Sequence, residues 1–474
     1  MKKVLWVTAI SVLLQTTVVF AEPTSGEMMD MLQKIQKQMS DMQRTIDSQN
    51  LKIQQLESKK VLETPQANAP MQPTAAMSEK EWERGLNGVK FGGDFRLRHE
   101  YFNFYEKNND AGSTGTANDR SRNRFRIRLR YGFEKDFGDD WKTGFRLATG
   151  SVTEPTGTNQ TLGNSGYFNF KTINLDRAYA TVEPSSFKDR GSLRSVKIGA
   201  GKFENPFLKY SNQMVWDADV TPEGLYEQAR FQVINSEKTK GEIQTTMGQF
   251  LVNENAAAET DAQIYGYQGV LSVATTALGT AEPVNLSGAV SYYDYTNWFQ
   301  TITSNTASTS YLRTNTIVAD DFRVLDLYPQ IEFEWGKTPV GLWVDYAVNL
   351  ANVGTEDVAQ SLGNDIHDAD DAWGVGFKIG KAKKKGGAEF AYSYYEIGAN
   401  SVVAAFNDSD FGGPGANGFT NRKGHKLSLG YRLTDSLMVN WTGYFVRPLT
   451  PSTVVANSTN ENVFRSQADL NFVF

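Results

Sequence analysis

The last fourteen residues of the chain read ENVFRSQADLNFVF (461–474), a stretch in which apolar and polar residues alternate. Successive side chains of a β-strand point to opposite faces, so this stretch would have one apolar and one polar face. The apolar face would carry Phe464, Ser466, Ala468, Leu470, Phe472 and Phe474. The polar face would carry Arg465, Gln467, Asp469 and Asn471. This pattern is typical of a barrel that meets lipid outside and water inside.

The same alternation recurs from Val89 to the C-terminus, in segments separated by turn residues. We expect about sixteen antiparallel strands, an even number as in single-chain bacterial barrels. The expected segments are 89–103, 120–136, 140–152, 172–183, 194–203, 222–235, 240–252, 261–276, 284–297, 321–336, 340–351, 371–381, 387–399, 421–434, 436–447 and 460–474.

The connections between these segments alternate in length, which is independent support for a membrane barrel. Long connections such as 104–119, 153–171, 204–221, 298–320, 352–370 and 400–420 follow odd-numbered segments. Most connections after even-numbered segments have only a few residues. Outer-membrane barrels have short periplasmic turns and long outer loops, so both chain termini are expected in the periplasm.

The composition excludes several classes of protein. The chain of 474 residues has no cysteine, which excludes disulfides and thiolate metal sites. Its mean hydropathy is −0.45. A helical membrane protein would need apolar runs of about 20 residues, and Val4 to Phe20 is the single candidate. A formal charge of −6 argues against a nucleic-acid partner.

The N-terminal region divides into three segments. Residues 1–21 have two lysines, an apolar run and a small residue at Ala21, as in a secretory signal peptide. Residues 22–62 have heptad spacing of apolar residues, which predicts a periplasmic α-helical coiled coil. An amphipathic helix packed on its own chain is the alternative. Residues 63–86 contain spaced prolines and form a linker, which leaves 87–474 for the barrel.

Seven arginines are expected to line the pore as a basic ladder. They alternate with apolar residues, and placing each in lipid would cost roughly 2–4 kcal/mol at mid-depth, so they must point inward. They are Arg96, Arg98, Arg122, Arg124, Arg126, Arg128 and Arg130. Asp94 and Glu100 share the polar face of the first strand, and further carboxylates occur at Glu332, Glu334, Asp345 and Glu389. We therefore expect a basic wall and a more acidic remainder.

The connection 204–224 is expected to fold into the lumen as a constriction loop. It combines prolines, aromatic residues and acids, whereas an exposed loop would more often be rich in Gly, Ser and Asn, as 400–420 is. Its acids would face the arginines. The residues expected to form the constriction are Trp216, Asp217, Asp219 and Glu223. A packed outer lid is the alternative.

The sequence contains no pattern that indicates an enzyme or a bound cofactor. Residues 364–371 are acidic but lack the glycine and the spaced glutamate of a calcium loop, so a solvated loop is the better interpretation. The three histidines are widely separated, and no catalytic triad, phosphate loop or zinc motif is found. We therefore expect no catalytic residues, no metal and no cofactor.

Several motifs in this order resemble the putative porins of Gram-negative outer membranes, over roughly Gly92 to Phe474. The motifs are Gly93–Glu100, Trp141 with Gly144–Gly150, Leu175–Tyr179, Gly201–Phe203, Trp216-Asp217, Thr221–Gly224, Ala372–Lys381 and Asp408–Phe411. The resemblance implies a pore of undefined substrate in the bacterial outer membrane. It also implies that the outer-membrane assembly machinery reads the C-terminal strand through Leu470, Phe472 and Phe474.

The sequence therefore predicts an outer-membrane porin for passive diffusion of small hydrophilic solutes and ions. One alternative is a substrate-specific anion channel, for phosphate or organic acids, built on the arginines. Another is a structural anchor in which the coiled coil ties the outer membrane to the cell wall. The expected partners are the lipid bilayer, the assembly machinery and two further copies of the chain, since Ile/Leu/Met seams permit three strands and general porins commonly form trimers.

Overall fold

The computed structural model describes residues 87–107, 120–152, 154–164, 166–210, 213–254, 261–298, 315, 322–351, 369–412, 420–449 and 461–474. The expected signal peptide, coiled coil and linker lie outside these residues. The search for membrane-spanning helices covered the described residues alone, and no helix there is long and apolar enough.

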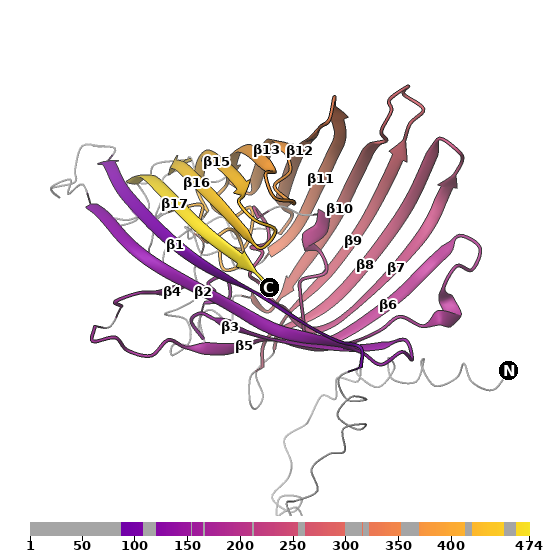
Figure 1. Ribbon diagram of the computed structural model, residues 1–474, viewed down its shortest axis with the longest axis horizontal. Helices are drawn as coiled ribbons and strands as arrows, with labels where there is room; N and C mark the ends of the chain where they lie inside the picture. The colour runs from indigo at the N-terminus through magenta and orange to yellow at the C-terminus, as the bar shows by residue number, and fades with distance from the viewer. Residues whose placement is uncertain are drawn as a thin grey trace, which may run out of the picture. The chain divides into compact units, whose positions relative to one another are not determined.

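Seventeen β-strands form one sheet in the described part of the chain (Figure 1). The first nine are β1 (Val89–Lys107), β2 (Arg120–Asp136), β3 (Trp141–Thr149), β4 (Gln160–Thr161), β5 (Ile173–Val182), β6 (Leu193–Lys202), β7 (Glu223–Asn235), β8 (Thr239–Asn253) and β9 (Ala262–Thr275). The others are β10 (Val284–Thr296), β11 (Phe322–Trp335), β12 (Thr338–Asn349), β13 (Asp371–Gly380), β14 (Ala388–Ile397), β15 (Arg422–Arg432), β16 (Leu437–Pro448) and β17 (Glu461–Val473). Two short 3-10 turns, η1 (Ser185–Phe187) and η2 (Leu208–Tyr210), complete the list of elements.

The sheet closes on itself through its first and last strands. β1 pairs with β2 on one side and antiparallel with β17 on the other, from Asp94 opposite Val473 to Lys107 opposite Glu461. The other strands of the wall pair with their neighbours in chain order, except that β3 pairs directly with β5. Closure removes the unpaired sheet edges, which the hydrocarbon of a bilayer cannot solvate. The predicted sixteen-stranded antiparallel barrel is therefore confirmed.

β4 is the one strand that the alternation did not predict. Its two residues pair with Arg126 and Ile127, beyond the point where β3 ends its pairing with β2. A pair this short gives no recognisable period. The connection between β3 and β5 thereby extends the wall and brings Asn159 to Arg96 of β1.

The outer face of the barrel is apolar along alternate positions. Phe125, Leu129, Tyr131 and Phe133 of β2 are exposed, as are Leu271, Leu342, Val344, Leu429, Phe445 and Leu470 on other strands. Exposed aromatic residues also lie near the short turns, at Phe137, Trp141, Trp335 and Phe474. Such a band with aromatic residues at its border is the surface that a bilayer requires.

The two ends of the barrel differ in their connections. β2 and β3, β11 and β12, and β15 and β16 are joined by tight turns; Gly336 adopts a φ of 67°, which a side chain would disfavour. We call this the short-turn end. The long connections lie at the opposite end. Two of them contain segments that fold inward and fill much of the lumen: residues 203–222 after β6 and 398–412 after β14.

Candidate functional site in the barrel lumen

Arginines of β1 and β2 lie directly opposite one another on the inner face of the barrel. Arg96 is opposite Arg128, and Arg98 is opposite Arg126. Like charges in directly opposite positions are destabilising, so this arrangement requires nearby carboxylates. The structure provides them from the neighbouring strands and from both inward segments.

Glu100 of β1 is the most deeply buried of these carboxylates. Its side chain is 0% exposed and is bonded to three neighbours. Arg465 donates from Nε and Nη2 to Oε2 at 3.1 and 2.6 Å, and Gln467 Nε2 donates to the same oxygen at 2.8 Å. Arg124 Nε donates to Oε1. One carboxylate of β1 therefore orders side chains from β2 and β17.

Two further acids of the wall hold Arg98, Arg128 and Arg130 in fixed positions. Asp94 accepts from Arg128 Nη2 and Arg130 Nε, both at 2.7 Å. Asp469 of β17 accepts two parallel bonds from Arg98, at 2.7 and 2.8 Å. Bidentate pairs of this kind fix the direction of the guanidinium plane as well as its position. The arginines are therefore held in place along the wall.

The segment 203–222 brings one of its acids to this wall. Asp219 Oδ1 lies 3.3 Å from Arg130 Nη1 and 4.0 Å from Arg128 Nη1. Its other oxygen accepts from Thr158 Oγ1 at 2.7 Å. The segment also reaches the opposite wall, where Trp216 packs against Tyr293 of β10 with ring centroids 5.4 Å apart. It therefore crosses the lumen.

The other acids of this segment lie away from the arginines. Asp217 is buried and accepts backbone N–H groups of Ser409 and Asp219 at 2.9 and 2.8 Å. Burial, with Asp219 and Asp408 nearby, raises the pKa of Asp217 well above its usual value. Glu223 lies at the start of β7, mostly exposed, and pairs with Lys202 at 2.9 Å. Of the three acids expected to face the arginines, Asp219 alone contacts them among the described residues.

The segment 398–412 is buried, and the prediction that 400–420 is an exposed loop is wrong for these residues. Its apolar residues Val402, Val403, Ala404, Ala405, Phe406 and Phe411 are at most 8% exposed. Asp410 lies 3.2 Å from Arg98 and 2.6 Å from Arg465, and these two arginines hold its pKa well below the usual range. Glycine, serine and asparagine here serve tight turns and backbone contacts rather than solvation.

The charges of the wall do not balance. We call Arg465 and the seven arginines of the expected ladder the arginine cluster. Eight guanidinium groups thus lie with five carboxylates, namely Asp94, Glu100, Asp219, Asp410 and Asp469, which leaves three positive charges among these groups. Arg96, which bonds to Asn159, and Arg122 have no carboxylate within 4.0 Å among the described residues.

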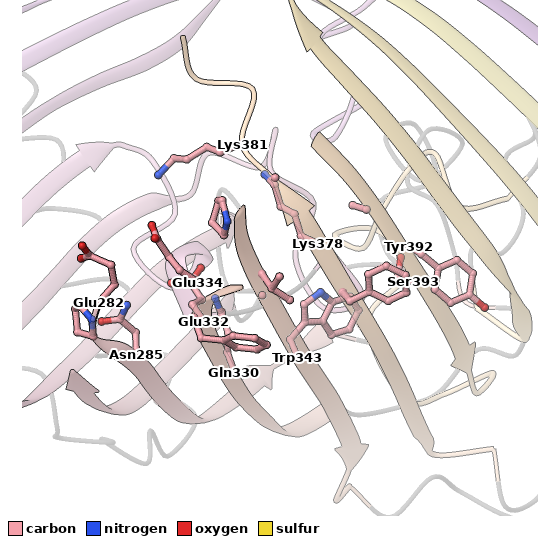
Figure 2. Close-up of a pocket in the computed structure, with 18 of the residues that line it drawn as sticks. Glu282, Asn285, Gln330, Glu332, Glu334, Trp343, Lys378, Lys381, Tyr392 and Ser393 are labelled. Carbon is pink, nitrogen blue, oxygen red and sulfur yellow. The ribbon is translucent and has the colours of Figure 1, made fainter. Parts of the chain in front are cut away.

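The carboxylates expected on the remaining wall are divided between two environments. Glu332 and Glu334 line a cavity of about 550 Å³ at the short-turn ends of β10 to β14. Lys378 and Lys381 line the same cavity, and Figure 2 shows Lys381 on the same side as Glu334. Lys378 pairs with Glu389 at 3.1 Å. Asp345, by contrast, is fully buried beside Asp326, away from the open cavity.

The C-terminal residues close the barrel on its outer face. Phe474 exchanges backbone hydrogen bonds with Gly93 at 2.9 and 3.2 Å, and its ring stacks on Tyr131. A Cβ atom at residue 93 would lie 2.9 Å from this ring, so the close approach requires glycine. Phe472 lies opposite Phe95 in the β1–β17 pairing and packs against it. Leu470 lies opposite Leu97. These three residues cover the seam between the first and last strands.

Sequence reasoning did not identify Arg465, Asp469, Asp410 and Lys426 as members of the lumen site. Arg465 and Asp469 were on the polar face of the last strand, so the signal was present. Asp410 belongs to a motif on which the family resemblance rests, but the sequence did not predict that it lies in the lumen. Lys426 bonds to Asp408 at 3.0 Å, a contact that depends on how the connection before β15 folds into the lumen.

The sequence matches the family described as a putative porin over residues 74–317 and 299–471. The chain belongs to this family. A search of curated proteins finds no match.

This porin is also similar to solved outer-membrane structures. OprB of Pseudomonas putida has 11% identity and a TM-score of 0.46, covering 84% of this chain and 96% of its own. OmpF of Salmonella typhi has 12% identity and a TM-score of 0.42, covering 81% and 97%. The outer membrane channel DcaP of Acinetobacter baumannii has 13% identity and a TM-score of 0.39, also covering 81% and 97%.

Proposed function

We propose that the chain is a passive pore for small hydrophilic solutes and ions, lined by the seven arginines of the expected ladder. The observation that supports this most directly is the closed ring of sixteen strands, apolar outside and charged inside. Charged side chains on an inner wall are stable only next to water or fixed counter-charges. A channel also agrees with the family to which the chain belongs. Nothing in this proposal requires a catalytic group.

Liposome swelling tests passive diffusion. Liposomes that contain the refolded mature protein should swell in isotonic solutions of small neutral sugars, faster for smaller sugars, without an energy source. Liposomes that contain the same amount of heat-denatured protein serve as the control. Equal swelling in the two preparations would contradict the proposal.

We propose that the narrowest part of the pore lies beside the contact of Asp219 with the arginines of β2. The support is the contact of Asp219 with Arg128 and Arg130 across the lumen, made by a segment anchored on the far wall through Trp216. Asp217 and Glu223 have other partners and are not part of this proposal.

An anion preference is a second candidate function, because the arginine cluster has three more positive charges than its acids. Guanidinium groups about 6.8 Å apart along one strand act together within a Debye length of about 8 Å. Replacing Arg124, Arg126 and Arg128 by serine should shift the reversal potential in a salt gradient toward cations. Asp219→Asn should shift it toward anions. Unchanged values in both variants would mean that ions pass elsewhere.

We further propose the roles expected for the ends of the chain. Residues 1–21 would direct export, and residues 22–62 would form a coiled coil at the short-turn end, in the periplasm, joined by residues 63–86 to the barrel. The seam of this coil favours a trimer. Leu470, Phe472 and Phe474 would be read by the assembly machinery before the β1–β17 seam closes.

A further inference from the structure

The segment 398–412 fills the side of the lumen that faces β10 to β17. Phe406 lies between three aromatic residues, with ring centroids 5.5 Å from Trp216, 5.6 Å from Trp298 and 6.4 Å from Tyr295. Phe411 packs edge-on against Tyr395 of β14 at 5.3 Å. These contacts bury the apolar residues of the segment against this part of the wall.

The segment is held at its far end by Asp410. Its carboxylate bonds to Arg98 of β1 and Arg465 of β17, and Arg465 Nη1 also donates to the backbone oxygens of Ser409 and Asp410 at 3.2 and 3.1 Å. Lys426 of β15 bonds to Asp408 at 3.0 Å. Polar bonds therefore attach the end of the segment to three strands of the wall.

The two arginines that hold Asp410 are fixed independently of the segment. Arg98 is bonded to Asp469, and Arg465 is bonded to Glu100, with both arginine side chains almost fully buried. Asp410 thus docks into a rigid pair of guanidinium groups. Because the two guanidinium groups are already ordered, they lose little conformational entropy when Asp410 binds to them.

The two inward segments support each other. The backbone N–H of Asp217 donates to Phe406 O at 2.6 Å, and that of Asp408 donates to Gln213 O at 2.8 Å. The N–H of Ser409 donates to Asp217 Oδ2. The segment 398–412 therefore also backs the segment that places Asp219 against the arginines.

Apart from the cavity at the short-turn ends of β10 to β14, the partly exposed charges of the lumen lie on the side that the segment leaves free. The side chains of Arg124, Arg126, Arg128 and Arg130 are 12–19% exposed. On the opposite wall, Tyr293, Asp326 and Asp345 are 0% exposed. Solutes that pass the barrel would therefore move along β2 rather than through the middle.

We infer that the segment 398–412 is a built-in plug, anchored by Asp410, that restricts the pore to the side of β2 and thereby sets the largest solute that can pass. This inference rests on the proposed pore function. It assigns size selection to a second inward segment in addition to 203–222, and it makes Asp410 a positioning residue that acts through the plug.

Conductance measurements on two variants test the plug. In the first, a short Gly/Ser linker replaces residues 400–411; single-channel conductance should rise about two-fold or more, because a bare sixteen-stranded wall encloses a wide aqueous lumen. In the second, Asp410→Ala should give noisier steps of higher mean conductance. Asp139→Ala, in the exposed turn after β2, is the matched control and should conduct like the wild type.

A labelling experiment gives a second readout that does not depend on conductance. The chain has no cysteine, so Ala404→Cys introduces a single thiol at a position that is 0% exposed. It should react slowly with a charged maleimide in the folded barrel, and at least ten-fold faster when combined with Asp410→Ala. Absence of conduction by the wild type would contradict the pore itself. Conduction by the wild type with unchanged steps and unchanged labelling in the variants would contradict the plug.

Discussion

Replacing Glu100 by glutamine should destabilise the barrel strongly, because this carboxylate neutralises a buried group of arginines. Its side chain is 0% exposed, and Arg465 beside it is 3% exposed. Removing one partner of a buried ion pair costs about 3–5 kcal/mol. Arg465 would keep Asp410, and Arg124 is partly solvated, so we expect the lower value, about 3 kcal/mol. This is a change of more than a hundred-fold in the unfolding equilibrium.

The measurement is equilibrium unfolding in urea of the protein refolded in detergent micelles, followed by tryptophan fluorescence and by the heat-modifiable band on a gel. Glu134→Gln is the matched control. Glu134 also points to the lumen, but it is 41% exposed and its nearest cation, Lys142, is 4.0 Å away. Exposed pairs contribute about 0–1 kcal/mol, so the control should unfold like the wild type. Equal effects of the two substitutions would refute the role assigned to Glu100.

Three further predictions concern assembly and pH. Deleting residues 22–75 should convert the proposed trimer into smaller species by mass in detergent, and an unchanged mass would mean that the barrel walls hold the subunits together. Deleting Phe474 should reduce the heat-modifiable barrel in the outer membrane, because both the proposed assembly signal and the packing on Tyr131 and Gly93 are lost; normal levels would contradict this. The raised pKa of Asp217 means that its contribution to stability is complete below pH 3.8 and is lost as the pH rises toward the raised value. Asp217→Asn should therefore lose less stability than the wild type in urea unfolding as the pH rises from 3.8 toward the raised pKa, and identical pH profiles would show that Asp217 does not titrate differently on folding.

The strands were predictable because the surroundings of the wall impose a period of two along every strand. Because lipid lies outside and polar groups lie inside, residues of a strand must be alternately apolar and polar. The faces of Phe125 and Arg126 could therefore be assigned from the sequence alone. The predicted limits of the strands agree with the observed limits to within a few residues. β4 was missed because two residues cannot show a period, and its place depends on where β3 ends.

The filling of the lumen was only partly predictable, because it depends on contacts between segments far apart in the chain. The composition of 204–224 correctly marked an ordered segment, but the sequence could not distinguish Asp219, which contacts arginines, from Asp217 two residues earlier. The glycine- and serine-rich residues around 398–412 led to the prediction of an exposed loop, so the plug was not predicted. The run Val402-Val403-Ala404-Ala405-Phe406 was the available signal, since an exposed loop has no use for five consecutive apolar residues.

Single-channel recording in planar bilayers tests the central claim most directly. The purified mature protein should insert in discrete steps whose current increases linearly with voltage, without any energy source, and whose size follows the conductivity of the salt solution. Protein shown to be folded by its heat-modifiable band, but giving no steps over repeated insertions, would contradict the assignment of this barrel as an open pore.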